Sequence, residues 1–326
     1  MFNKFPKIKQ FHNVYKEMFE KDHYPVSFKT KVKIHGTNAA ITLFNSEIFF
    51  QSRNNNITLN NDNNGFVSWA FNDISFWQNL AKYHNITIFG EWCGPKIMKG
   101  TAANLINNRI FAIISIYDFD KEIMVNDPKE IEKYFVDGFF NSIKIIPYHV
   151  YDDNTTEISI DFNSYNSVIN AEEKINNELE KIQNNDPFFY ENFNVTGKCE
   201  GLVLTPITNS KEFYKNMAFK AKTDEYKSVT QKKSVQKNPE SFENIENFLN
   251  NVMTQNRLEQ GMIETFGNMN DFDAKQIGYF LKWIGQDIYQ ECQDELISSG
   301  LEWDKNLTKK LNNKAKNWFI NGGNFS

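Results

Sequence analysis

Residues 31–40 read KVKIHGTNAA and place a lysine at the end of an extended segment, directly before a histidine-glycine turn. Lysines alternate with apolar or small residues over residues 26–34, a pattern that predicts a β-strand with one lysine-bearing face. Residues 35–38, His-Gly-Thr-Asn, are typical of a turn. The predicted strand therefore presents Lys31 and Lys33 on one face, and Lys33 stands where the strand meets the turn.

Lys33 is a candidate nucleophile. A lysine amine attacks only when it is unprotonated, and burial or a neighbouring cation lowers its pKa. We expect repulsion from Lys31 to lower the pKa of Lys33, and we expect Gly36 to let the backbone approach a ligand closely. Taken alone, the stretch is more typical of a solvated strand edge that ends in a turn.

Three further stretches combine strand signals with charged residues. FGEWCGP ends an apolar strand with Glu91, and KCEGLVL opens another with Glu200. FKAK places Lys220 and Lys222 on one face of a strand, where they can bind a polyphosphate. The two carboxylates can bind a ribose hydroxyl or Mg²⁺ next to phosphates. Each stretch alone also fits a strand end that faces water, so the hypothesis depends on the four together.

The length and composition of the chain exclude several classes of protein. Its 326 residues are enough for two domains. No apolar run of about 18 residues predicts a transmembrane helix, and the start lacks the apolar region of a secretory signal. Three separated cysteines without a CxxC pair argue against a disulfide framework or a zinc site. We therefore expect a cytoplasmic protein with no membrane partner.

The charge of the chain is unevenly distributed. The net charge is −5, which is not that of a basic nucleic-acid-binding protein. Residues 209–237, however, hold eight lysines against three acidic residues, whereas residues 238–326 hold eight basic and thirteen acidic residues. A basic stripe on an acidic protein can still bind phosphates.

The sequence pattern divides the chain into two predicted domains. Up to residue 233, short apolar strands alternate with helical stretches, which predicts an α+β domain. Residues 238–326 follow a period of 3.6 and predict a small all-helical domain after a polar, lysine-rich linker. Within these domains we predict helices over 65–84, 242–253 and 277–288, a strand over 213–222, and a loop over 184–192.

Taken together, the order Lys-x-His-Gly, Gly-Glu, Glu-Gly and Lys-x-Lys resembles the covalent nucleotidyltransferase superfamily of ATP-dependent ligases and RNA-capping enzymes. KIHGTN is closer still to the phage RNA ligase 2 family, which includes the trypanosome RNA-editing ligases. The resemblance spans nearly the whole chain. It implies an α+β nucleotidyltransferase (adenylation) domain with antiparallel sheets over residues 1–233. It also implies a small all-α C-terminal domain for RNA nick recognition over residues 238–326.

The resemblance implies roles for the residues at matching positions. Lys33 is the nucleophile that takes AMP, Glu91 binds the ribose, and Tyr117 stacks on adenine. Glu200 is linked to the metal. The chain departs from the family at one position, because Val32 stands where well-known members carry Glu. The implied catalytic residues are Lys33, Lys220 and Lys222; the implied cofactor-binding residues are His35, Asn38, Arg53, Glu91, Tyr117 and Glu200; and QNRLEQ and QDIYQE imply RNA binding by Arg257, Asp287 and Glu291.

The function that the resemblance implies is that of a monomeric, ATP-dependent RNA ligase, and an origin in a phage genome is compatible with it. Such an enzyme joins 3′-hydroxyl and 5′-phosphate RNA ends at nicks in duplex RNA or RNA–DNA hybrids, through lysyl-AMP and AMP–RNA, with Mg²⁺ or Mn²⁺. One alternative is a GTP-using capping guanylyltransferase, which Asp in place of His35 and an OB-fold C-terminal domain would favour. Another is a non-catalytic RNA-binding protein on a ligase scaffold, against which the intact Lys33, Glu91 and Glu200 argue.

Overall fold

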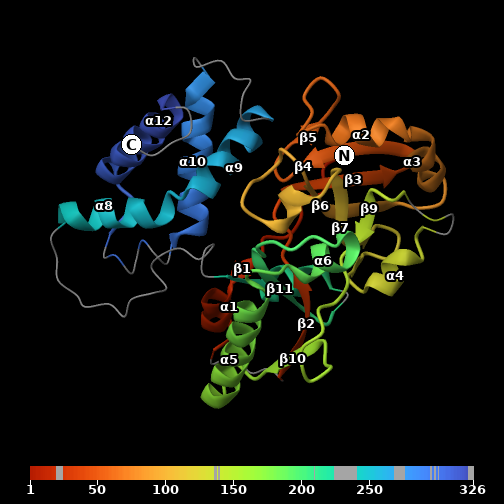
Figure 1. The fold of residues 1–326 in the computed structure, drawn as a ribbon, viewed down its shortest axis with the longest axis horizontal. Coiled ribbons are helices and arrows are strands. Elements are labelled where there is room, and N and C mark those ends of the chain that lie inside the picture. The colour runs from red at the N-terminus through yellow and green to blue at the C-terminus, as the bar shows by residue number, and fades with distance from the viewer. Residues whose placement is uncertain are drawn as a thin grey trace. The chain divides into compact units, whose positions relative to one another are not determined.

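The computed structural model of the protein describes residues 1–19, 25–135, 138, 140–208, 210–223, 241–267, 276–293, 296, 299 and 301–321. The chain forms two compact units, Met1–Tyr226 and Lys227–Ser326 (Figure 1). The expected domain boundary, between residues 233 and 238, and most of the expected linker lie outside the described residues. The described part of the first unit mixes strands and helices, and that of the second unit is helical.

Strand β2 (Val26–Val32) confirms the strand predicted from the lysine alternation and belongs to a five-stranded sheet. Within the described residues the order of this sheet is β1-β12-β11-β2-β10, and only β1 and β12 pair in parallel. Lys33, directly after β2, therefore lies beside β11, which comes from a distant part of the sequence. The other strands are β1 (Lys9–Gln10), β10 (Glu157–Ile160), β11 (Gly201–Pro206) and β12 (Phe219–Lys222).

The second sheet of the first unit follows the turn after Lys33. Among the described residues its order is β5-β4-β3-β6-β7-β8, with β9 pairing in parallel with β7 and all other pairs antiparallel. The predicted α+β class with antiparallel sheets is thus confirmed. The strands are β3 (Thr37–Phe44), β4 (Glu47–Ser52), β5 (Asn56–Ile57), β6 (Ile86–Cys93), β7 (Ile110–Asp118), β8 (Ile123–Val125) and β9 (Ile143–Ile145).

The helices of the first unit confirm one prediction and correct two others. Helices α2 (Phe66–Asn72) and α3 (Ile74–Ala81) lie where a helical region was predicted. The predicted strand over residues 213–222 is wrong in its first half, because α7 (Lys211–Met217) precedes β12. The remaining helices are α1 (Phe11–Met18), η1 (Ala102–Leu105), α4 (Pro128–Glu132), α5 (Tyr165–Ile182) and α6 (Pro187–Phe193).

The loop predicted over residues 184–192 is also wrong, because α6 occupies most of it. Asp186 is the N-cap of α6, and its carboxylate accepts from the backbone N–H groups of Phe188 and Phe189 at 3.0 and 3.3 Å. Pro187 at the first helical position fits this start, because its missing N–H group has no intrahelical partner there. The Asp-Pro pair is therefore a helix start rather than a turn.

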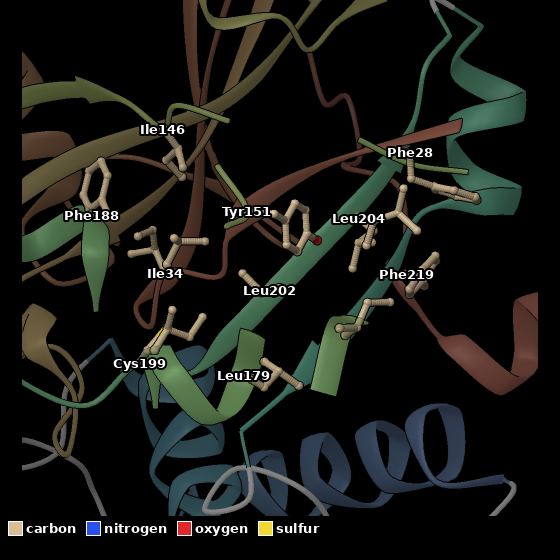
Figure 2. Packing of buried hydrophobic residues seen from close by; sticks show 14 of the residues in the cluster. Phe28, Ile34, Ile146, Tyr151, Leu179, Phe188, Cys199, Leu202, Leu204 and Phe219 are labelled. Carbon is tan, nitrogen blue, oxygen red and sulfur yellow. The ribbon is translucent and has the colours of Figure 1, made fainter. Parts of the chain in front are cut away.

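The main core of the first unit lies against one face of the β2 sheet. Figure 2 shows Leu202 and Leu204 of β11 among the buried side chains, with Leu179 of α5 nearby. Phe28 of β2 is fully buried, and the Thr30 and Tyr151 hydroxyl groups form a hydrogen bond of 2.7 Å within this layer. Because the apolar residues of β2 are packed on this side, its lysines are directed to the opposite face.

The second unit buries the apolar stripes that the sequence predicted. Leu249 and Val252 of α8 pack in one cluster with Phe280 and Ile284 of α10, so both predicted helices are confirmed. Trp318 joins the same cluster. The described helices are α8 (Ser241–Val252), α9 (Gln255–Phe266), α10 (Ile277–Glu291) and α12 (Lys305–Ile320). A search of all described residues finds no helix whose length and apolar content would let it cross a bilayer.

Gly201, the first residue of β11, lies close to β12 and to the end of β2. Its φ of +149° lies in a region that side chains rarely adopt, and an added Cβ would stand 2.1 Å from the backbone oxygen of Ala221 in β12. The carbonyl of Gly201 accepts from the backbone N–H of Lys33 at 2.8 Å. The glycine therefore lets β11 lie close to β12 while it fixes the backbone of the residue after β2.

We expect Gly201→Ala to destabilise the first unit by about 2–5 kcal/mol, because the added methyl group combines backbone strain with overpacking. Urea unfolding followed by tryptophan fluorescence measures this. Gly278→Ala is the matched control, since no atom lies within 4 Å of its added Cβ in α10, and it should stabilise its helix by about 1 kcal/mol. An unfolding midpoint equal to that of the unsubstituted protein would contradict the role of Gly201.

Candidate active site

The strand register collects lysines on the face of the β2 sheet opposite the core. Lys31 stands opposite Val203 of β11, and Val203 stands opposite Lys220 of β12. Gly201 stands opposite Lys222 in the same way. Because directly opposed residues of antiparallel strands share a face, Lys31, Lys220 and Lys222 lie on one side of the sheet. Three of the four sequence stretches that predicted a site thus meet in this sheet, whereas the fourth, FGEWCGP, belongs to β6 of the second sheet.

Glu200, the residue before β11, is the centre of the site. Its Oε2 atom lies 2.7 Å from Lys33 Nζ and 3.1 Å from His35 Nδ1, and its Oε1 atom lies 3.1 Å from Lys222 Nζ. The Glu200 side chain is only 5% exposed, whereas those of Lys33 and Lys222 are 23% and 28% exposed. A single buried carboxylate therefore gathers two ammonium groups and an imidazole that solvent can partly reach.

The electrostatics of this cluster reverse one expectation. Burial disfavours the Lys33 ammonium, but attraction to Glu200 and Glu91 outweighs burial and raises the pKa of Lys33 above its ordinary value. Burial likewise disfavours the Glu200 carboxylate, but Lys33 and Lys222 overcome it and hold the pKa of Glu200 well below its usual range. The prediction that Lys31 lowers the pKa of Lys33 is wrong, because the dominant partner is a carboxylate.

Two lysines near Lys33 have a lowered pKa. Burial lowers the pKa of Lys31 to about 7, although the charge of Asp127 opposes the change. The Lys31 amine donates to the backbone oxygen of Ile114 in β7 at 2.7 Å, so it is directed to the second sheet. Burial also lowers the pKa of Lys222 to about 8, and repulsion from Lys33 acts in the same direction. The sequence marked Lys31 only as a neighbour of the nucleophile, and its link to β7 was missed.

Glu91 and Asn38 lie opposite each other on β6 and β3. Asn38 Oδ1 is buried, and no described residue supplies it with a hydrogen-bond donor. Gly36 lies against β6, where an added Cβ would stand 2.5 Å from the backbone oxygen of Trp92 and 2.9 Å from Glu91 Cγ. The glycine therefore allows a close approach of two protein segments, and it brings the turn after Lys33 onto the strand of Glu91.

Two further predicted residues differ in their relation to the cluster. Arg53 follows β4, and its charge acts on Lys33, which places it within electrostatic reach of the nucleophile. Tyr117 stands opposite Thr87, four residues along β6 from Glu91, which is about 13 Å in a strand. The amine of Lys211 lies 4.2 Å from the centre of the Tyr117 ring and covers one of its faces. The charge of Arg53 thus acts on Lys33 directly, whereas Tyr117 lies farther along the β6–β7 pair and its role towards adenine stays a prediction.

The three residues predicted to recognise RNA belong to the second unit. Arg257 Nε donates to Asp287 Oδ2 at 2.9 Å, and Arg257 Nη1 donates to the backbone oxygen of Val252 at 2.6 Å. The same Nη1 atom lies 3.1 Å from Cys292 Sγ, and the charge of Glu291 adds to the attraction. Arg257 therefore ties α9 to α10 and to the end of α8, so much of its donor capacity is used inside the unit.

The donor set of the first unit fits a nucleotide and a divalent cation. Asn38 Oδ1 is a buried acceptor that can receive a ligand donor, and Lys220, Lys222 and Arg53 supply positive charge for phosphates. Across the described residues, no group of three or more His, Cys, Asp or Glu could hold a metal. Mg²⁺ needs no such cage, because it binds through one or two carboxylates plus substrate phosphates. Glu200 is the carboxylate that fits this role.

Comparisons with known proteins find one family and several similar solved structures. The family described as RNA ligase matches residues 27–222. Among solved structures, a Naegleria gruberi RNA ligase variant with ATP and Mn is similar at 19% identity and a TM-score of 0.45, and the same organism's RNA ligase with PPi is similar at 18% identity and a TM-score of 0.46. Each match covers 69% of this chain and 57% of that chain. No curated protein sequence matches the chain.

We expect Glu200→Gln to lower the pKa of Lys33, because the neutral amide removes the main charge that stabilises the ammonium while burial remains. Competitive acetylation over a pH series, followed by peptide mass spectrometry, measures this at Lys33. Glu157→Gln, which removes the partner of Lys29 on the same sheet, is the control and should leave the Lys33 midpoint in place. Equal midpoints in both variants would refute the dominance of Glu200.

Proposed function

The chain belongs to the RNA ligase family, and on that premise we propose that it is an ATP-dependent RNA ligase that joins 3′-hydroxyl and 5′-phosphate ends. The observation that carries the proposal is the convergence of Lys33, His35 and Lys222 on Glu200. The family match begins in β2 and ends with β12, so it contains this entire cluster. Residues 1–233 would act as the adenylation domain.

In the proposed first step, Lys33 Nζ attacks the α-phosphorus of ATP. A phosphorus–nitrogen bond forms, the bond to the bridging oxygen breaks, and pyrophosphate leaves. Lys33 must first lose a proton, which the salt bridge to Glu200 opposes. Any positive charge that binds the Glu200 carboxylate weakens this bridge, and burial then lowers the pKa of Lys33. Lys33 would therefore lose its proton and become reactive when another positive charge binds the Glu200 carboxylate.

The remaining residues of the site support binding and charge neutralisation. Lys220 and Lys222 would neutralise the charge that develops on the phosphates, and His35 holds Glu200 in place through its Nδ1 atom. When bound, Mg²⁺ would supply further positive charge to the phosphate oxygens. Glu91 and Asn38 would bind the ribose and the adenylate. Tyr117 would stack on adenine, as the resemblance to RNA ligases implies.

In the later steps, AMP passes from Lys33 to the 5′-phosphate of an RNA end. A 3′-hydroxyl then attacks that phosphate, and AMP leaves. The covalent intermediate divides one difficult condensation into easier phosphoryl transfers. We propose nicked duplex RNA or an RNA–DNA hybrid as the substrate of a monomeric enzyme, recognised through A-form shape, 2′-hydroxyls and phosphates rather than through sequence. Residues 238–326 would carry this recognition.

A capping guanylyltransferase is the second candidate within the same enzyme superfamily. His35 rather than Asp follows the nucleophile, and the described part of the second unit consists of helices instead of the strands of an OB fold. Both features favour the ligase. The choice of nucleotide is the property that separates the two.

We expect Lys33→Ala to abolish covalent transfer of radiolabelled AMP from ATP to the protein, seen on a denaturing gel. Lys33→Arg should not restore it, because a guanidinium stays protonated and cannot attack. Lys29→Ala is the matched control on the same strand, since Lys29 pairs with Glu157 and Thr156 instead of Glu200. Normal labelling of the Lys33→Ala protein would disprove the assignment of the nucleophile.

We also expect labelled ATP, but not labelled GTP, to modify the protein, with a preference of at least about 100-fold, corresponding to roughly 3 kcal/mol of discrimination. The reason is the ligase-like KIHGTN stretch. Parallel incubations with each nucleotide and Mg²⁺, quantified on one gel, measure the ratio. Comparable labelling by GTP would move the protein to the capping class.

A further inference from the structure

Helix α12 differs in charge from the rest of residues 238–326. Its sixteen residues include five lysines and no acidic residue. Residues 238–326 hold eight basic and thirteen acidic residues in all, so the part outside α12 has only three basic residues against the same thirteen acids. An anion as highly charged as a nucleic acid would be repelled by most of this segment and attracted to α12.

The lysines of α12 divide into an inner and an outer set. Lys310 reaches Glu246 of α8 at 3.4 Å, and Lys314 forms a hydrogen bond with Asn250 of the same helix. Lys305, Lys309 and Lys316 are exposed, and no carboxylate in the described part of the chain forms an ion pair with them.

The outer lysines form one continuous stripe. Their spacings, together with Asn313 between them, follow the three- and four-residue steps that define one face of a helix. The stripe extends over about 17 Å from Lys305 to Lys316. The opposite face of α12 carries the buried residues Leu311 and Ala315, so the orientation of the helix is fixed by packing and the lysines are held towards solvent.

An open hollow lies at the start of this stripe. It is lined by Trp303, Asp304, Lys305, Thr308, Lys309, Asn312 and Asn313. The Trp303 ring packs edge-on against the half-exposed ring of Tyr289 in α10, with 5.2 Å between centroids. The Asp304 carboxylate in this lining accepts from the backbone N–H of Leu307 at 2.8 Å, and the Thr308 hydroxyl donates to the Asp304 backbone oxygen. The hollow therefore adds two ammonium groups and side-chain amides to an aromatic wall, the types of group that bind phosphates and bases.

We propose that the outer face of α12, defined by Lys305, Lys309, Asn313 and Lys316 with the Trp303 hollow, is a docking surface for the phosphate backbone of RNA. The proposal rests on the proposed ligase function for the identity of the polyanion. Most of the electrostatic contact with RNA would then come from these lysines, with which no described carboxylate forms an ion pair. Arg257 would contribute less, because its guanidinium donates to Asp287 and to the Val252 backbone inside the unit. Contacts of this kind position RNA without reading its sequence.

The experiment measures binding of the full-length protein to a fluorescent nicked RNA duplex, without ATP, over a series of salt concentrations. The test variant is Lys305→Ala, Lys309→Ala and Lys316→Ala together, since alanine is a good helix former and these side chains are exposed. Each lost phosphate contact should reduce the slope of log affinity against log salt by about one. We expect a slope smaller by about 2–3 and binding at least about tenfold weaker at low salt.

The control removes the same charge from exposed positions of the first unit through Lys82→Ala, Lys129→Ala and Lys133→Ala. It should keep the slope of the unsubstituted protein. An unchanged slope in the α12 variant, or an equal loss in the control, would overturn the proposal, as would α12-dependent binding to phosphatidylserine vesicles without binding to RNA. Lysyl-AMP formation is measured on the same samples and should not change. If the unsubstituted protein forms none but binds RNA through α12, the ligase function fails and the docking surface stands.

Discussion

The first unit depends on one buried carboxylate that holds two ammonium groups and an imidazole. Burying Glu200 without partners would be costly, and burying Lys33 and Lys222 side by side without a counter-charge would be costly as well. The carboxylate offsets the cost of burying the two ammonium groups, and they offset its own. The Glu200 oxygens lie 2.7 Å from Lys33 Nζ and 3.1 Å from Lys222 Nζ. The two sequence-distant halves of the β2 sheet are therefore held together at the point where the chemistry is proposed to occur. The same bridge keeps Lys33 protonated, so stability and reactivity oppose each other at one pair of atoms.

The backbone supports this pair through Gly201. The next residue after Glu200 has a backbone conformation that requires glycine, and its carbonyl accepts from the N–H of Lys33. The carboxylate and the amine thus belong to two adjacent backbone segments joined by a hydrogen bond of 2.8 Å. Such an anchor fixes where both side chains start and leaves their ends free to exchange partners. A nucleophile that must change partners needs this combination of a rigid base and a mobile end.

Much of the fold and part of the site follow from the sequence. Alternation placed Lys31 and Lys33 on one face, because the side-chain period of a strand is two. Alternation does not say where a long side chain ends, so it missed the bond from Lys31 to Ile114 in another sheet. The register of β7 against β6, which shifts at Gly90 and sets Tyr117 opposite Thr87, was not predicted either. Register depends on pairing between distant segments, and no local pattern encodes it.

The two units use lysine in physically different ways. In the first unit the lysines of the site lie in surroundings that are buried or partly buried, and these surroundings shift the pKa of Lys31 and Lys222. A pKa that responds to the surroundings suits an amine that must lose a proton. It also makes the charge of such a lysine, and therefore its attraction to phosphates, depend on what binds the Glu200 carboxylate. On α12 the outer lysines are exposed and remain ordinary point charges, which suits non-specific attraction to phosphates. A chain with a net charge of −5 can therefore be expected to bind a polyanion, because local arrangement rather than total charge decides where phosphates are attracted.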